Sequence, residues 1–286
     1  MPNILIAGCG DVGTALGLRL AADGNRVYGL RRNVSALPAA LTPLAADLAS
    51  PSSLRSLPEV DYVYFTAAAD GRDETAYRRA YVTGLRNLVE AVAGQRVRRL
   101  IFVSSTSVYG QRAGEWVDED SDTSPARFTG AIVLDGEREA RASSFPVTAV
   151  RFGGIYGPGR NRLIDKVLSG AGCVDHPPVY TNRIHRDDCA GVLQHLLTLP
   201  EPAAVYLGVD CEPAPQCAVM DWLARQLDAP QPRRKPAPAD PDQGKRASNA
   251  RLLASGYSFL YPTFREGYAD VIRRVRSDPG EPGGTE

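Results

Sequence analysis

The sequence predicts an α/β fold built on a doubly wound parallel β-sheet. Two observations lead to this prediction. Short apolar segments alternate with helical patterns through the first half of the chain. In addition, the apolar segment at 3–7 leads directly into a glycine-rich turn and a helix-like stretch. This order is typical of parallel strands joined by crossover helices, with ligands bound beyond the carboxyl ends of the strands.

The glycine-rich turn has the sequence Gly-Cys-Gly-Asp-Val-Gly at positions 8–13. In the pattern Gly-x-Gly-x-x-Gly, the glycines permit a tight turn, close approach of the backbone to a pyrophosphate, and close contact between strand and helix. The helix expected at 14–23 adds free N–H groups and a partial positive charge for the phosphates. The alternative is a chance turn, but the position between a strand and a helix favours dinucleotide binding. We therefore expect a dinucleotide to be bound by Gly8, Gly10, Asp11, Val12 and Gly13.

The second strand, expected at 25–30, indicates which dinucleotide binds. Its end lies about 20 residues beyond the glycines, where an NAD site usually carries Asp or Glu for the ribose 2′-hydroxyl. This chain has Arg31, Arg32 and Asn33 there. Two guanidinium groups would pair with a 2′-phosphate, and no carboxylate is present to repel it. We expect NADP in preference to NAD; the alternative is a loop with two solvated arginines.

The composition is that of an ordinary globular protein, with 43% hydrophobic and 23% charged residues. Lys and Arg number 33 and Asp and Glu number 33, so the net charge is zero and nucleic-acid binding is not expected. No apolar stretch of the sequence reaches membrane-spanning length, and a first strand at residue 3 leaves no room for a signal peptide. We expect a cytoplasmic protein that does not bind membranes.

The five cysteines are odd in number and lack the spacing of metal ligands. They are Cys9, Cys173, Cys189, Cys211 and Cys217. This scattered pattern favours reduced thiols over a disulfide framework and predicts no metal site.

Further elements continue the alternation of strands and helices. Strands are expected at 44–47, 61–66, 99–104 and 147–152, and helices at 74–93 and 131–143. After residue 152 a turn-rich stretch, Gly-Gly-Ile-Tyr-Gly-Pro-Gly-Arg at 153–160, precedes shorter elements. Later in the chain we expect helices at 187–199 and 217–227, a strand at 204–208, and a proline-rich loop at 229–243.

These patterns divide the chain into three parts. Residues 1–152 are expected to form a Rossmann-type NAD(P)-binding domain. Residues 153–276 are expected to form a smaller mixed region that binds substrate and packs on that domain. Residues 277–286 are rich in Gly and Pro, which predicts a disordered tail.

Four motifs give the chain a resemblance to a known family. They are Ser-Ser-Thr-Ser-Val-Tyr-Gly at 104–110, Arg-Phe-Gly-Gly-Ile-Tyr-Gly-Pro-Gly at 151–159, Arg-Ile-His-Arg-Asp-Asp at 183–188, and Lys-Arg-Ala-Ser-Asn-Ala-Arg-Leu-Leu at 245–253. In their order and spacing they resemble the extended short-chain dehydrogenase/reductase superfamily, in its NAD-dependent epimerase/dehydratase branch. The resemblance covers residues 3–268, nearly the full chain.

The resemblance implies further contacts to the cofactor. It places residues 47 and 48 near the adenine ring and the segment after the fourth strand along the cofactor. The glycine fingerprint departs from the family pattern Gly-x-x-Gly-x-x-Gly, because Ala7 stands at the first position with Gly8 beside it. The additional cofactor-binding residues expected are Asp47, Leu48, Thr66, Ala67, Ala68 and Ser104.

Family chemistry rests on a Ser or Thr together with a Tyr-x-x-x-Lys pair. The neighbouring ammonium lowers the pKa of the Tyr from its usual value near ~10, so that the phenol can exchange protons. Ser105 occupies the serine position, but alignment on Glu137 puts Thr129 at the Tyr position and Val133 at the Lys position. None of the three lysines has a Tyr four residues before it. The chain therefore resembles an atypical branch without this pair.

Other residues in the same region are candidates for the missing chemistry. Ser105 or Thr106 is expected to act as a hydrogen-bonding group near the nicotinamide. Tyr109 and Thr129 are further catalytic candidates, although the resemblance gives Tyr109 a position that is usually structural.

Candidate substrate contacts lie in the second half of the chain. Tyr156, Arg160 and Arg183 are expected to contact an anionic substrate such as a nucleotide diphosphate. Solvated arginines are the alternative, and the resemblance gives Tyr156 a usually structural position. His185 is a candidate base near neutral pH, but its family-like position favours packing or a role in the substrate region.

Two functions therefore stay open. The first is an NADP-dependent oxidoreductase, epimerase or dehydratase that acts on a sugar-like or nucleotide-sugar small molecule. The second is a non-catalytic NAD(P)-binding sensor or scaffold with a degenerate site. The resemblance also implies a homodimer through the helices at 74–93 and 131–143.

Overall fold

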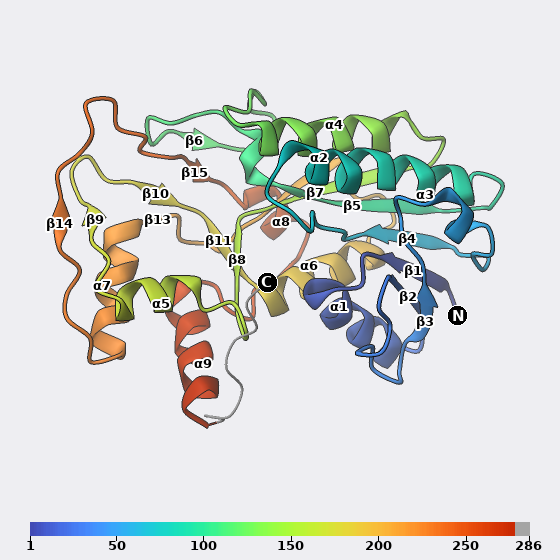
Figure 1. The fold of residues 1–286 in the computed structure, drawn as a ribbon, viewed down its shortest axis with the longest axis horizontal. Helices are drawn as coiled ribbons and strands as arrows, with labels where there is room; N and C mark the ends of the chain where they lie inside the picture. The colour runs from blue at the N-terminus through green and yellow to red at the C-terminus, as the bar shows by residue number, and fades with distance from the viewer. Residues whose placement is uncertain (278–286) are drawn as a thin grey trace. The chain divides into compact units, whose positions relative to one another are not determined.

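The structure is a computed structural model that describes residues 1–277 (Figure 1). The chain divides into two compact units, each assembled from separate segments. Unit 1 consists of Met1–Gly110, Asp122–Arg151 and Cys189–Tyr206. Unit 2 consists of Gln111–Ser121, Phe152–Asp188 and the chain from Leu207 onward.

This division differs from the single boundary that the sequence predicts after residue 152. Residues 111–121 belong to unit 2, and residues 189–206 belong to unit 1. The latter join unit 1 because they contact its strands: Tyr64 Oη donates to the Leu193 carbonyl at 3.0 Å, and the Ala149 N–H donates to the Ala204 carbonyl at 2.9 Å. The functional assignment of the two regions stays a prediction. The expected tail at 277–286 begins at the last residue of a helix, and 278–286 lie outside the described residues.

Unit 1 is built around a seven-stranded sheet with the order β12-β7-β5-β4-β1-β2-β3. The neighbouring pairs among β5, β4, β1, β2 and β3 are parallel. The order reverses between β1 and β4, which makes their carboxyl ends a topological switch point. The predicted doubly wound parallel sheet is confirmed. Its strands are β1 (Asn3–Ala7), β2 (Arg26–Arg31), β3 (Thr42–Ala45), β4 (Tyr62–Phe65), β5 (Arg99–Ser105), β7 (Val147–Phe152) and β12 (Val205–Gly208).

Helices cover both faces of this sheet. In Figure 1, α1 and α6 lie on one face, and α2, α3 and α4 lie on the other. Because both faces are covered, the central strands are continuous apolar runs, and Ile4, Leu5 and Ile6 are fully buried. The helices are α1 (Asp11–Ala22), α2 (Glu74–Arg78), α3 (Gly84–Val92), α4 (Phe128–Ala142) and α6 (Arg186–Thr198).

Two elements of unit 1 differ from the sequence predictions. The helix expected at 74–93 is helical throughout, but a π-helical turn at Arg79–Thr83 separates α2 from α3. The third strand ends at Ala45 rather than at residue 47. It ends early because the Asp47 carboxylate accepts the Ala49 N–H at 2.9 Å and so forms a turn.

Unit 2 combines short strand pairs with helices. Its core holds side chains from several elements, including Tyr156, Leu223, Phe264 and Val271. The sequence analysis did not predict α5, α8 or α9. The strands are β6 (Trp116–Val117), β8 (Gly154–Tyr156), β9 (Cys173–Val174), β10 (Tyr180–Thr181), β11 (Arg183–His185), β13 (Ala214–Pro215), β14 (Arg234–Lys235) and β15 (Arg246–Ala247), and the helices are α5 (Arg162–Leu168), α7 (Gln216–Gln226), α8 (Ala250–Ala254) and α9 (Phe264–Ser277).

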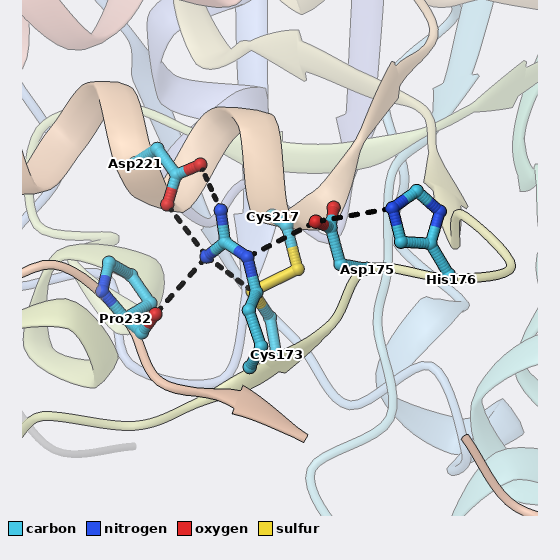
Figure 2. Close-up of a disulfide and its surroundings, with 7 residues drawn as sticks. Cys173, Asp175, His176, Cys217, Asp221 and Pro232 are labelled. Carbon is cyan, nitrogen blue, oxygen red and sulfur yellow. Dashed lines mark hydrogen bonds and ion pairs between the residues drawn. A yellow bond between two sulfur atoms is a disulfide. The ribbon is translucent and has the colours of Figure 1, made fainter. Parts of the chain in front are cut away.

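A disulfide joins Cys173 of β9 to Cys217 of α7 in the core of unit 2 (Figure 2). The expectation of reduced thiols is therefore wrong for these two cysteines, whereas the other three are free. The two sulfurs are 44 residues apart in sequence and meet only because β9 packs against α7. Beside the bond, Arg234 pairs with Asp221 at 2.6 Å and with Asp175 at 3.2 Å. The pair with Asp221 anchors the proline-rich segment on α7, and the pair with Asp175 ties it to the residue after β9.

Within residues 1–277, none of the helices has the length and apolar character needed to cross a bilayer. The cytoplasmic location stays a prediction.

Candidate functional site

The glycine turn after β1 is tight and lies against the segment after β4. Gly8 has φ +89°, a left-handed conformation that favours glycine. Its N–H and that of Cys9 both donate to the Leu30 carbonyl, at 3.0 and 2.9 Å, which ties the turn to the end of β2. A Cβ at Gly8 would lie 2.3 Å from the Ala67 Cα. A larger residue at Gly8 would therefore displace either the turn or the segment after β4.

The start of α1 lies open beside this turn. Gly10 is the N-cap residue, and no side chain caps the helix there. A Cβ at Gly10 would meet only the Gly8 carbonyl oxygen, at 3.9 Å, so the backbone is approachable from outside. Asp11 is exposed, whereas Val12 and Gly13 are buried in the first turn against the sheet. A helix start without a side-chain cap leaves first-turn N–H groups for a ligand, and binding of a pyrophosphate there stays a prediction.

The predicted residues after β4 lie next to the glycine turn. Thr66 Oγ1 donates to the Gly8 carbonyl at 2.9 Å, and it lies 3.0 Å from the position that a Cβ of Gly13 would take. Ala67 contacts Gly8 directly, and Ala68 is exposed beyond it. The structure therefore brings the ends of β1 and β4 together at the switch point, where a cofactor of this fold binds.

The two arginines after β2 have different surroundings. Arg31 Nη1 donates to the Cys9 carbonyl at 3.4 Å, so its guanidinium lies beside the glycine turn. Arg32 pairs with Asp70 at 2.8 Å, and both side chains are about half exposed. The expectation that no carboxylate is present here is wrong, because the loop after β4 brings Asp70 to Arg32 across 38 residues of sequence. This arginine lowers the pKa of Asp70 through a hydrogen bond and its charge, so the carboxylate stays ionised.

Asp47 and Leu48 lie beside the π-helical turn. The Asp47 carboxylate pairs with Arg79 at 2.7 Å, and the Leu48 carbonyl accepts a hydrogen bond from Asn87 at 2.8 Å. These contacts hold the segment after β3 against the start of α3. A role of Asp47 and Leu48 beside the adenine ring stays a prediction.

A buried network after β5 joins residues that the sequence analysis treated separately. Ser104 Oγ donates to Glu137 Oε1 at 2.6 Å, so this hydroxyl is directed into the protein interior. Arg151 donates to both oxygens of Glu137, at 2.9 and 2.8 Å, and to Tyr109 Oη at 2.7 Å. This geometry favours structural roles for Ser104 and Tyr109.

In this network the negative charge of Glu137 is neutralised by direct contact with the guanidinium of Arg151. Burial alone would raise the pKa of Glu137, but hydrogen bonds and charge from Arg151, with smaller contributions from Ser104 and Arg141, hold it below its usual value. Although burial works against the cation, Glu137 raises the pKa of Arg151. From the sequence alone, Glu137 only sets an alignment, and Arg151 has no assigned role beyond its place in a motif.

The candidate hydroxyl groups lie on the turn between the two ends of this network. Ser105 Oγ accepts the Ser107 N–H at 3.1 Å and caps a short 3-10 turn, Thr106–Val108. The start of α4 lies directly against this turn, since a Cβ at Gly130 would be 2.2 Å from the Ser107 carbonyl oxygen. Thr129 precedes that contact and is half-buried, whereas Val133 is buried one turn later.

The predicted substrate residues of unit 2 have buried side chains, except Arg160. Tyr156 stacks on Tyr268 with ring centroids 4.3 Å apart, and its hydroxyl oxygen would lie 1.8 Å from a Cβ at Gly267. This placement inside the core favours a packing role for Tyr156. Arg183 is buried, lies 5.6 Å from the Phe264 ring and donates to Thr181. Arg160 is exposed in the turn after Gly159.

A second buried carboxylate lies close to Arg183. The Asp210 N–H donates to the Arg183 carbonyl at 2.7 Å, and Asp210 Oδ2 is buried without a hydrogen-bond partner among the described residues. Burial raises the pKa of Asp210 to about 7, against the opposing charge of Arg183. A partly protonated carboxyl group is consistent with an oxygen that has no donor beside it.

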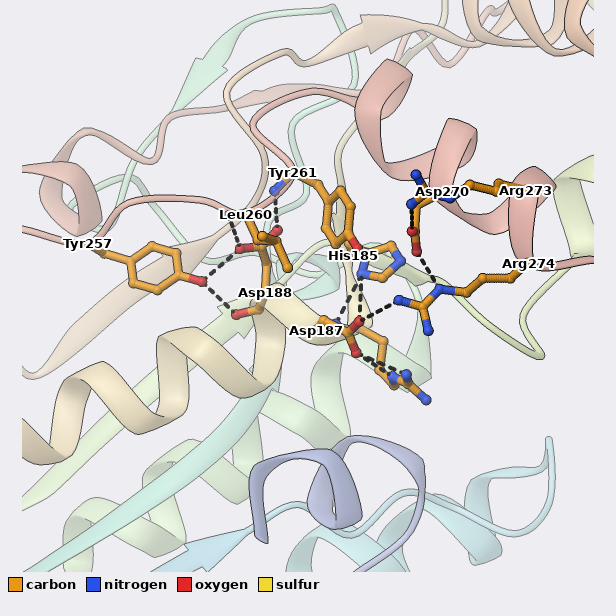
Figure 3. Close-up of polar contacts among 10 residues, drawn as sticks. His185, Asp187, Asp188, Tyr257, Leu260, Tyr261, Asp270, Arg273 and Arg274 are labelled. Atoms are coloured by element: carbon orange, nitrogen blue, oxygen red, sulfur yellow. Dashed lines mark hydrogen bonds and ion pairs between the residues drawn. The ribbon is translucent and has the colours of Figure 1, made fainter. Parts of the chain in front are cut away.

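His185 lies beside Asp187, Asp188 and Tyr261 (Figure 3). It is fully buried, and its Nδ1 accepts the Asp187 N–H at 3.1 Å, which leaves the ring proton on Nε2. Burial lowers its pKa to about 4. The neighbouring Asp188 accepts hydrogen bonds from Tyr257, at 2.7 Å, and from the backbone of the 260–261 segment. These contacts favour a structural role for His185 over a catalytic base.

Within the described residues, no group of three or more His, Cys, Asp or Glu side chains is placed to hold a metal ion.

Known proteins resemble this chain over the region that holds the glycine turn and most of the parallel sheet. Residues 4–172 match the NAD dependent epimerase/dehydratase family. The chain belongs to this family. The match covers the glycine turn and the motifs at 104–110 and 151–159, and it confirms the resemblance to this family.

Individual relatives extend the likeness over nearly the full chain. A 3-diazoavenalumate denitrifying reductase of Streptomyces is 27% identical over 93% of this chain and 98% of its own. A solved structure from Methylobacillus flagellatus, assigned as an NAD-dependent epimerase/dehydratase, is 36% identical over 96% of this chain and 99% of its own, with a TM-score of 0.81. The UDP-glucuronic acid 4-epimerase of Bacillus cereus, solved with NAD, shares the fold at 20% identity, with 95% and 99% coverage and a TM-score of 0.78.

Proposed function

We propose that this protein is an NADP(H)-preferring oxidoreductase, epimerase or dehydratase that acts on a sugar-like or nucleotide-sugar substrate. The observation that carries the proposal is the open glycine turn at the switch point, where the backbone is approachable at Gly10 and no side chain caps the start of α1. A nicotinamide cofactor bound there would accept or supply a hydride. Membership of the epimerase/dehydratase family supports catalysis with such a cofactor.

We assign different roles to the hydroxyl groups around the turn after β5. We infer that Ser105 or Thr106 donates a hydrogen bond to the reacting oxygen of the substrate, because neither hydroxyl is committed to the buried network. Tyr109 is not placed to exchange a proton with a substrate, since its side chain is buried and its hydroxyl contacts Arg151 inside the protein. Thr129, at the start of α4, is a further hydroxyl beside this turn.

The substrate class follows from the relatives and from the exposed arginine of unit 2. The names of two similar proteins concern a reductase and a UDP-sugar epimerase, which supports a small organic substrate. Arg160 is exposed and suited to an anionic group, whereas the burial of Arg183 and Tyr156 favours support of the surrounding structure. The homodimer stays a prediction.

We expect Arg31→Ala to weaken NADPH binding by about ten- to a hundredfold and NADH binding by less than about threefold. The reason is that a guanidinium beside the glycine turn makes charge-assisted hydrogen bonds to a 2′-phosphate, which NADH lacks. Asp70→Asn is a matched variant with the opposite expected effect on NADPH binding. It removes a negative charge and releases Arg32, so NADPH should bind up to about fivefold more tightly. Isothermal titration calorimetry of each variant with both cofactors measures these effects.

Equal or stronger binding of NADH by the unaltered protein would reject the NADP preference. A loss in Arg31→Ala that is the same for both cofactors would reject the role of this side chain in reading the 2′-phosphate.

For catalysis, we expect Ser105→Ala to reduce turnover by about a hundredfold with little change in cofactor affinity. The assay follows cofactor absorbance across a panel of nucleotide sugars. The second candidate function is a non-catalytic NAD(P) sensor, and the buried, apolar Val133 in α4 favours it. Cofactor binding without turnover on the panel would leave that alternative ahead.

A further inference from the structure

Ser105 and Thr106 lie on a segment whose two ends are bound by one ion pair. At one end, Ser104 Oγ donates to Glu137 Oε1 at 2.6 Å. At the other end, Tyr109 Oη accepts from Arg151 Nη1 at 2.7 Å. Arg151 and Glu137 are themselves joined by two hydrogen bonds, at 2.9 and 2.8 Å. A ring of contacts therefore closes around the turn that carries the candidate hydroxyl groups.

The ion pair is a fixed anchor for this ring. Glu137 is 0% exposed and Arg151 is 4% exposed. Opening the pair would leave an unpaired charge in the interior, which is strongly unfavourable. Arg151 also lies 5.0 Å from the centre of the Tyr109 ring, so the guanidinium contacts both the face and the hydroxyl of this residue.

Helix α4 fixes the middle of the same segment. Only a hydrogen atom fits at Gly130, because a Cβ there would be 2.2 Å from the Ser107 carbonyl oxygen. Ser105 Oγ accepts the Ser107 N–H, which sets the side chain of Ser105 within the 3-10 turn. The segment is thus held at both ends by side chains and in the middle by backbone.

We propose that the Glu137–Arg151 pair is a positioning device that sets the Ser105 and Thr106 hydroxyl groups for the nicotinamide half of the cofactor. It acts through Ser104 and Tyr109, which are positioning residues and touch neither cofactor nor substrate. This inference rests on the proposed function, which assigns Ser105 and Thr106 to that half.

The test compares two buried tyrosine hydroxyls of unit 1. Tyr109→Phe removes the acceptor of Arg151, whereas Tyr64→Phe removes an equally buried hydroxyl that donates to the Leu193 carbonyl at 3.0 Å. Amide hydrogen exchange is measured on the full chain without cofactor. We expect exchange at residues 105–109 to become about tenfold faster in Tyr109→Phe and to stay unchanged in Tyr64→Phe.

A second readout uses two ligands that differ only in the nicotinamide ring. NADP⁺ and 2′-phospho-ADP-ribose are titrated calorimetrically into both variants. Tyr109→Phe should weaken NADP⁺ about fivefold and leave the fragment unchanged. Equal weakening of both ligands, or exchange at 105–109 no faster than in Tyr64→Phe, would overturn the inference.

Two further outcomes can be distinguished from failure of the inference: the unaltered protein does not bind the ligands, or the variant does not fold. If the unaltered protein binds neither ligand, the proposed cofactor site fails, and the exchange comparison alone then decides whether the ion pair holds the turn. If Tyr109→Phe does not fold, Ser104→Ala removes the contact at the other end of the ring, and the same two measurements with the same expected results apply to it.

Discussion

Glu137→Gln is expected to lower the free energy of unfolding by about 3–5 kcal/mol. The carboxylate is fully buried and accepts hydrogen bonds from Ser104, Arg141 and Arg151. An amide keeps the shape but removes the charge, so Arg151 is left as a buried cation without a counter-ion. Urea denaturation followed by far-ultraviolet circular dichroism measures the change.

A second glutamate on α4 provides the control. Glu139 pairs with Arg86 at 2.6 Å, but these side chains are 33% and 52% exposed. Solvent screens such a pair, and Glu139→Gln should cost only about 0–1 kcal/mol. Equal losses in the two variants would contradict the distinction between the buried and the exposed pair.

The same pair predicts a pH dependence. The folded-state pKa of Glu137 is held below its unfolded value near ~4.3, so its contribution is present above that value and is lost as pH falls through the folded pKa. The stability difference between the unaltered protein and Glu137→Gln should therefore be constant near neutral pH and shrink below about pH 4. Repeating the denaturation from pH 7 to pH 3 checks this sign. A difference that grows on acidification would exclude Glu137 as its source.

Local features of the cofactor region were predictable from the sequence. The apolar run at Ile4–Ile6 predicts a strand buried on both faces, and those residues are fully buried. The Gly-x-Gly-x-x-Gly pattern needs only neighbouring residues to form its turn, and Gly8 has the positive φ that the pattern implies. Helix α9 was also predictable from the sequence. Its apolar residues recur at helical spacing, and all are buried: Phe264, Tyr268, Val271 and Ile272.

Long-range partners could not be predicted in this way. Nothing near Arg32 in sequence indicates that Asp70 pairs with it, because the contact exists only once β2 and β4 flank β1. Ser104 could be matched to a motif, but its direction depends on where α4 places Glu137. In such cases the residue type is known from the sequence, but the fold determines whether its side chain points toward the cofactor or into the protein interior.

The disulfide is the other feature that sequence spacing could not predict, and it carries the second large effect. We expect the Cys173→Ser, Cys217→Ser double variant to lose about 4 kcal/mol of unfolding free energy. The bond closes a loop with a sequence separation of 44, and cross-linking such a loop removes entropy from the unfolded chain. Both cysteines are also buried in the core of unit 2, so the loss should be concentrated there. Urea denaturation, with hydrogen exchange to locate the change, measures it.

Cys211→Ser is the matched control, since Cys211 is free and exposed and its replacement leaves the cross-link intact. Its stability should change by less than about 0.5 kcal/mol. Reduction of the unaltered protein should reproduce the loss in the double variant, and reduction of the double variant should have no further effect, because both treatments remove the same constraint.

Thiol counting by mass spectrometry after alkylation identifies the bond directly. Five alkylated cysteines in the unfolded, unreduced protein would contradict the disulfide. If the bond is present but stability does not change on reduction, contacts between β9 and α7 hold this core without the cross-link.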